Sequence, residues 1–64
     1  MKTEEKIKKI LRVDFPAARI NRIMLYPRHS GIDMTMTARI NGVTVAMSFL
    51  PEYSRKAIYR LINN

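Results

Sequence analysis

The chain has 64 residues, enough for one small domain that buries only about 60% of its unfolded surface. It has no cysteine and one histidine, which excludes a disulfide framework, a thiolate metal site and a metal site built from several imidazoles. Twelve Lys and Arg stand against five Asp and Glu, and the net charge of +7 favours an anionic partner.

No targeting or membrane segment is visible in the sequence. The charged N-terminus is not followed by the apolar run that is typical of a signal peptide. The longest apolar runs have four residues, far fewer than a membrane span needs. Since a chain without cysteine suits a reducing compartment, we expect a cytoplasmic protein that does not contact a membrane.

A first helix is expected over residues 3–13. Three apolar residues repeat at helical spacing: Ile7, Ile10 and Leu11. Thr3 is the expected N-cap, because its hydroxyl can accept a hydrogen bond from a free N–H of the first turn. Pro16 disfavours helical backbone in the residue before it, so the helix should end near Val13.

A first strand is expected over residues 19–26. Its apolar residues fall on two faces, with Ile20, Met24 and Tyr26 on one face and Ile23 and Leu25 on the other. The register of this strand therefore stays open.

Residues 32–50 predict a β-hairpin, because apolar and polar residues alternate on both sides of Asn41-Gly42. This dipeptide is the strongest two-residue hairpin signal, since a type I′ turn needs positive φ at both positions. Four apolar pairs are then expected across the strands: Ile40 with Val43, Ala38 with Val45, Met36 with Met47, and Met34 with Phe49. In this register every apolar residue of the hairpin lies on one face.

A closing helix should start at Pro51, which is well tolerated at the first helical position. Its apolar stripe consists of Ile58, Leu61 and Ile62. The element order predicts one α-β-β-β-α domain over residues 1–64, of the α+β class. A three-stranded antiparallel sheet with both helices packed on one face buries both apolar stripes.

We expect no enzymatic activity from this sequence. His29 stands beside Ser30 in a His-Ser-Gly loop, a pattern more typical of a turn than of part of a catalytic triad. Gly31 and Gly42 both fit turns, so no glycine-rich phosphate loop exists. The five carboxylates are scattered over helix, loop and strand. No catalytic residue, metal ligand or cofactor is therefore expected.

The basic residues fall into three groups: on the first helix, between Arg19 and the loop Arg28-His29-Ser30-Gly31, and on the last helix. Each group alone is typical of a solvated face, but three groups together in one small domain favour phosphate contacts with DNA or RNA. The residues expected to make these contacts are Arg28, His29, Arg55, Lys56 and Arg60, with Lys6 and Lys9 as second choices. Three tyrosines could stack on bases or pack at the edge of the core: Tyr26, Tyr53 and Tyr59.

The element order resembles that of a double-stranded-RNA-binding domain, which also runs helix, three strands, helix. In that family the first helix, the loop between the first two strands and the start of the last helix contact nucleic acid. The resemblance implies such contacts from Arg28-His29-Ser30-Gly31 and Arg55-Lys56. The Gly-Pro-x-His loop pattern of the family is absent from this chain, as is the alanine-rich face of its last helix, so the resemblance covers the layout and no specific motif.

The segment 43–49 favours a second class of function. It carries no charge, and in a simple meander it is an edge strand, which natural proteins usually protect with Lys, Pro or a bulge. Three arrangements are open: the first strand pairs with it, a helix covers it, or a second chain adds to it. The last arrangement predicts a homodimer, or a module that binds and inhibits a larger protein, whose surface would be acidic to match the charge of this chain.

Overall fold

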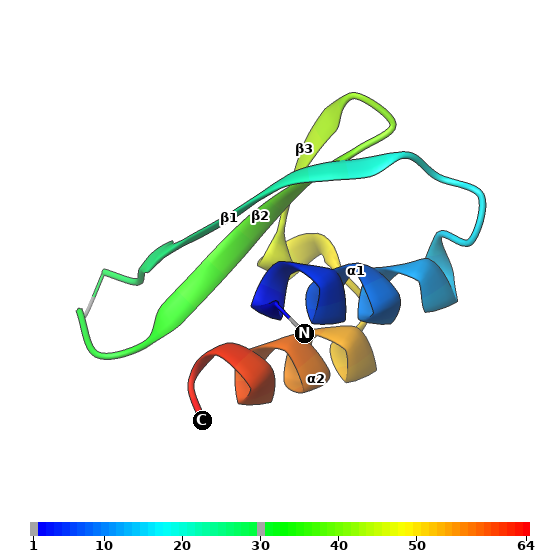
Figure 1. The fold of residues 1–64 in the computed structure, drawn as a ribbon. Coiled ribbons are helices and arrows are strands. Elements are labelled where there is room, and N and C mark those ends of the chain that lie inside the picture. Colours follow the sequence, from blue (N-terminus) through cyan, green and yellow to red (C-terminus); the bar gives the residue numbers. More distant parts are fainter. Residues whose placement is uncertain (1, 30) are drawn as a thin grey trace.

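The computed structural model describes residues 2–29 and 31–64. Its elements run in the order α1 (Thr3–Asp14), β1 (Ile20–Pro27), β2 (Met34–Ile40), β3 (Val43–Ala46), a short 3-10 helix η1 (Met47–Phe49) and α2 (Glu52–Ile62). The three strands form one antiparallel sheet, and both helices lie on the same face of it (Figure 1). The helices contact each other and the sheet, so the predicted α+β architecture is confirmed.

Between the helices and the sheet lies a core to which every element except β3 contributes a buried apolar side chain. The buried residues are Ile7, Leu11, Ile20, Met36, Ala38, Ile40, Met47, Leu50 and Ile58. The predicted stripes of both helices face this core, because Ile10, Leu61 and Ile62 pack against it as well. In the described part of the chain, neither helix is long and apolar enough to cross a membrane.

The start of α1 differs from the prediction. Lys2 is the N-cap and no side chain caps the helix, so the assignment of this role to Thr3 is wrong. Thr3 is instead the first helical residue, followed by Glu4 and Glu5, whose negative charge suits the positive end of the helix dipole. The helix ends at Asp14, one residue later than predicted.

β1 contains a β-bulge that the sequence pattern did not reveal. Between the pairs Asn21 with Arg39 and Met24 with Thr37, two residues of β1 oppose a single residue of β2. Within this bulge Arg22 has a φ of 50°, in the left-handed region that only a few per cent of non-glycine residues adopt.

The bulge decides the register of β1. Ile20 pairs with Ile40 and Leu25 with Met36, and both partners are buried on the helix-facing side of the sheet. Five positions separate Ile20 from Leu25, a spacing that would place them on opposite faces of a regular strand. The predicted grouping of Ile20 with the even-numbered apolar residues of the strand is therefore wrong.

The turn of the predicted hairpin is confirmed. Asn41-Gly42 has φ values of 52° and 81°, as a type I′ turn needs. Ile40 pairs with Val43 and Ala38 with Val45, in the predicted register. The strand order is β1-β2-β3, so the alternative in which the first strand pairs with the third is wrong.

The second half of the predicted hairpin does not form, because β3 ends at Ala46 and the chain continues as η1. Two expected pairs are therefore absent from the ladder: Met36 with Met47, and Met34 with Phe49. Three apolar residues assigned to the buried face are instead exposed: Ile32, Val43 and Phe49. The predicted apolar face is buried along β2, at Met36, Ala38 and Ile40, but not at these three positions.

The change from strand to 3-10 helix has a packing reason. Met47 and Leu50 are both buried, and they stand three positions apart, the spacing at which 3-10 side chains align. A continued strand would have placed Leu50 on the outer face. The 3-10 helix η1 carries the chain beneath the sheet. Pro51 is then the N-cap of α2, so this helix begins at Glu52, one residue later than predicted.

Two side chains fasten α2 to the rest of the molecule. At its start, the Asp14 carboxylate of α1 accepts hydrogen bonds from the Tyr53 hydroxyl and, at 2.7 Å, from the buried Ser54 hydroxyl. At its end, the Met34 N–H donates to Asn63 Oδ1 at 2.6 Å, and Asn63 Nδ2 donates to the Met34 carbonyl at 3.0 Å. Because β3 does not extend this far, the Asn63 amide takes the place of a neighbouring strand.

Candidate functional site

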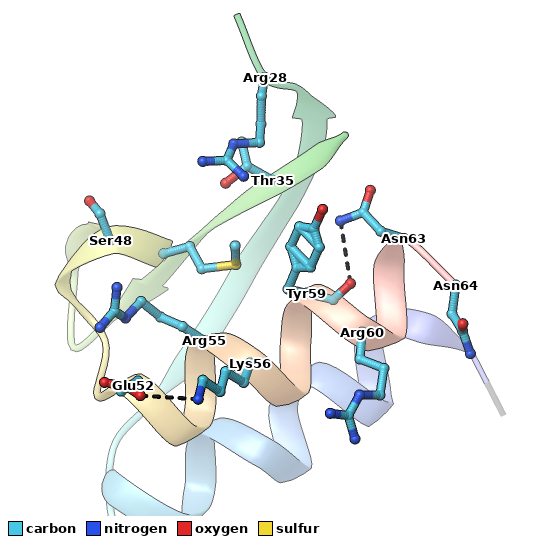
Figure 2. A pocket seen from close by; sticks show the side chains of 11 residues that line it. Arg28, Thr35, Ser48, Glu52, Arg55, Lys56, Tyr59, Arg60, Asn63 and Asn64 are labelled. Atoms are coloured by element: carbon cyan, nitrogen blue, oxygen red, sulfur yellow. Dashed lines mark hydrogen bonds and ion pairs between the residues drawn. The ribbon is translucent and has the colours of Figure 1, made fainter. Parts of the chain in front are cut away.

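Four basic side chains from two distant segments line one open hollow of about 760 Å³, which we name the basic groove. Arg28 directly follows β1, whereas Arg55, Lys56 and Arg60 lie on α2. In Figure 2, Arg28 stands above the hollow and Arg55 and Lys56 lie below it, on the wall that α2 forms. The structure thus brings together four of the five residues that the sequence ranked first for phosphate contacts.

The loop after β1 fixes the position of Arg28. The Arg28 N–H donates to the Asp33 carbonyl at 2.8 Å, and the Arg28 carbonyl accepts from the Gly31 N–H at 2.8 Å. Gly31 has a φ of 74°, which glycine adopts without strain. The backbone of Arg28 is therefore held on both sides while its side chain remains exposed.

Between the basic walls, the groove is lined by Tyr59, which the sequence offered for base stacking, and by residues that the sequence did not indicate. Met47 and Tyr59 contribute apolar surface, while Thr35, Ser48 and Asn63 contribute polar groups. The end of β3 at Ala46 creates this space, because η1 turns away and leaves the Thr35 end of β2 paired with β1 alone. Apart from Tyr59, no local sequence signal could have found these residues, since they meet only through that change of direction.

Two carboxylates compensate part of the charge of the groove. Asp33 Oδ2 lies 3.9 Å from Arg28 Nη1. Glu52, which is one turn before Lys56 on α2, has its Oε1 3.1 Å from Lys56 Nζ. A hydrogen bond with Asp33 also raises the pKa of the Tyr59 hydroxyl above its ordinary value. Within residues 2–29 and 31–64, no ion pair involves Arg55 or Arg60, so these guanidinium groups remain available to a ligand.

A second hollow, between the helices, extends the basic surface and has a volume of about 540 Å³. It is lined by Lys6 and Lys9 from α1 and by Arg60 from α2. Arg60 lines both hollows, and in Figure 2 its side chain points away from Arg28. The second-choice lysines are therefore joined to the basic groove through Arg60.

The remaining predicted contact residues lie elsewhere. His29 is exposed in the loop after Arg28 but does not line the basic groove, and Ser30 lies outside the described residues. Of the tyrosines, Tyr53 is engaged with Asp14, and Tyr26 pairs with a threonine of β2 on the sheet face away from the helices. Tyr59 alone of these three lines the basic groove.

Among residues 2–29 and 31–64, no group of three or more His, Asp or Glu side chains is placed to hold a metal ion. A scan against protein-family models finds no match for this chain, and searches of the curated proteins and of the solved structures find none either.

Proposed function

We propose that this protein is a non-enzymatic nucleic-acid-binding protein that holds backbone phosphates in the basic groove and acts as an accessory or regulatory factor. The observation that supports this proposal is the meeting of Arg28 with Arg55, Lys56 and Arg60 around one open hollow. Lys6 and Lys9 continue this surface along α1, so that cations are spread over a length rather than gathered at a point.

The composition of the groove suits a phosphodiester backbone. Arginine offers a planar fork of N–H donors that matches two phosphate oxygens, and three of the four cations of the groove are arginine. The hydroxyls of Thr35 and Ser48 add neutral donors of the kind that contact phosphate and sugar. Such contacts position a nucleic acid without reading its sequence.

The carboxylates of Asp33 and Glu52 compete with a phosphate for two cations of the groove. A phosphate that binds Arg28 replaces the 3.9 Å contact with Asp33, and one that binds Lys56 replaces the 3.1 Å contact with Glu52. These ion pairs are partly or fully exposed, and exposed pairs contribute about 0–1 kcal/mol, so a phosphate can displace them at little cost. Arg55 and Arg60 need no such exchange.

Binding should therefore depend steeply on salt, and a triple substitution tests this. Replacing Arg55, Lys56 and Arg60 with Ala should weaken binding to duplex DNA, duplex RNA and single strands. It should also flatten the slope of log affinity against log salt by up to about 3 units on duplex DNA. Fluorescence anisotropy with labelled nucleic acids between about 50 and about 200 mM salt measures both quantities.

A matched control removes three charges elsewhere. Lys2, Lys8 and Arg12 of the α1 region line neither the basic groove nor the hollow between the helices, and their replacement with Gln should change the affinity far less. Glu52→Gln should have the opposite effect on affinity and strengthen binding, because it frees Lys56.

If wild-type protein binds no nucleic acid at low salt, the proposal is wrong. The alternative function, binding of a protein partner at the edge formed by residues 43–49, then replaces it. In the structure the strand at this edge, β3, has four residues.

A further inference from the structure

Three arginines gather at the end of the sheet that lies far from the basic groove. Arg19, Arg22 and Arg39 line a hollow of about 710 Å³, together with Asn41 of the hairpin turn. We name this hollow the arginine notch. No carboxylate is among its lining residues, so its positive charge is uncompensated at close range.

The β-bulge of β1 builds this cluster. Arg22 occupies the extra position with a φ of 50°, a conformation that is uncommon for a residue with a Cβ atom. Bulges redirect side chains, and strained backbone persists where the surrounding structure enforces it. Here the result is that Arg22 lines a hollow that Arg19 and Arg39 also line.

The frame around the notch is fixed by hydrogen bonds. The Arg19 N–H donates to Asn41 Oδ1 at 3.0 Å, and the Asn41 N–H donates to the Arg19 carbonyl at 2.9 Å. Arg39 Nε donates to the Gly42 carbonyl at 3.1 Å, which leaves the terminal nitrogens of its guanidinium for another partner. Hydrogen bonds therefore hold the backbone of Arg19 and the side chain of Arg39 in place before any ligand arrives.

The notch and the basic groove face different directions. Arg28 follows one end of β1 and Arg19 precedes the other, and a strand of eight residues spans about 26 Å. Arg39 pairs with Asn21 on the sheet face away from the helices, whereas Arg55, Lys56 and Arg60 lie on α2, beneath the opposite face (Figure 1). A straight duplex lying in the groove would not reach the notch.

We propose that the arginine notch is a second phosphate-binding site for a nucleic-acid backbone, and that with the basic groove it lets one protein molecule bridge two segments of nucleic acid. This inference rests on the proposed function for its first segment. The bridge itself depends on the notch. Nine of the twelve basic residues line at least one of the three hollows, and six of these nine lie in the basic groove or between the helices. The other three, Arg19, Arg22 and Arg39, line the notch and would hold the second segment.

A capture assay tests the bridge. A duplex fixed to a surface is loaded with protein, and retention of a second, fluorescent duplex of unrelated sequence is measured. Wild-type protein should retain the second duplex, and the double variant Arg19→Gln with Arg22→Asn should not. Asn tolerates left-handed backbone, so this variant keeps the bulge while it removes two charges. The control with Lys2→Gln and Arg12→Gln loses the same charge and should still bridge.

The outcomes separate this proposal from the function on which it rests. Binding of one duplex by wild-type protein without retention of the second overturns the bridge alone. Equal bridging by the notch variant also overturns it, since a dimer or the groove must then hold both duplexes. Absence of any duplex binding overturns the proposed function itself.

A titration with inorganic tripolyphosphate examines the notch without nucleic acid. The Nε–Hε NMR signals of Arg19, Arg22 and Arg39 should shift, and those of Arg12 should not. No shift at the notch overturns the site. A shift without bridging would assign the notch to free phosphorylated compounds and overturn its role for nucleic acid.

Discussion

At the residue scale, the Asp14 carboxylate is the group that links the two helices. Asp14, the last residue of α1, accepts hydrogen bonds from Tyr53 and Ser54 in the first turn of α2. These two bonds, Tyr53 first, lower the pKa of the Asp14 carboxyl below its ordinary value of 3.8. The same hydrogen bond raises the pKa of the Tyr53 hydroxyl, because ionisation would remove the proton that Tyr53 donates to Asp14.

The lowered pKa of Asp14 predicts the direction of an acid transition. Its contribution to stability is complete above pH 3.8, the unfolded value, and is lost as the pH falls through the lower pKa of the folded state. Asp14→Asn should therefore lower the Tm at pH 7 and lose less stability than wild type on acidification. Thermal melts from pH 7 to strongly acidic buffer measure this difference. Glu5→Gln removes an exposed carboxylate of the first turn of α1 and should change the acid limb less than Asp14→Asn does; an equal change would contradict the role of Asp14.

At the scale of elements, the boundary between β3 and η1 decides which apolar residues are buried. Leu50 is 4% exposed and Phe49 is 82% exposed, the reverse of what a continued strand predicts. Burial of Met47 and Leu50 on one side requires a spacing of three, which a strand cannot supply. The same boundary leaves part of β2 open, and the basic groove forms there.

Paired alanine substitutions distinguish the two arrangements. Leu50→Ala should lower the free energy of unfolding by about 2–5 kcal/mol, because it leaves a cavity in the core. Phe49→Ala removes a side chain that is mostly in water and should change stability by about 0.5 kcal/mol or less. Denaturant unfolding measures both values. A larger loss from Phe49→Ala than from Leu50→Ala would show that the hairpin continues past Ala46.

On the scale of the whole molecule, positive charge opposes folding. The net charge of +7 is confined to a body whose longest extent is 34 Å. The ion pairs of Lys8 with Glu4, Arg28 with Asp33 and Lys56 with Glu52 are all partly or fully exposed, and such pairs add little. A 64-residue chain has about 3–10 kcal/mol of stability, so this repulsion is a sizeable part of the balance.

Added salt should therefore raise the stability. Raising NaCl from about 0.01 to about 0.1 M shortens the screening length from about 30 Å, close to the length of the molecule, to about 10 Å. We expect the Tm to increase over this range, as measured by circular dichroism. The variant with Gln at Lys2, Lys8 and Arg12 carries less charge and should show a smaller increase. A decrease with salt would mean that the ion pairs outweigh the repulsion.

The sequence by itself determined the elements whose signals are local. Asn41-Gly42 specified the type I′ turn and the pairing next to it, because only that turn places both residues at positive φ. The apolar spacing of both helices predicted their buried faces, and the alternation around the turn predicted the sheet. Together these signals were sufficient for the fold.

Only the tertiary structure decided the features that depend on packing between distant segments. The bulge at Arg22 lets Ile20 and Leu25 share a face, and the end of β3 lets Leu50 enter the core. Both features interrupt the two-residue period of a strand. A prediction from the sequence pattern takes this period as unbroken, so it cannot locate the interruptions. The position of Arg28 opposite the cations of α2 follows from these breaks, because the groove between them exists only where β3 leaves the sheet.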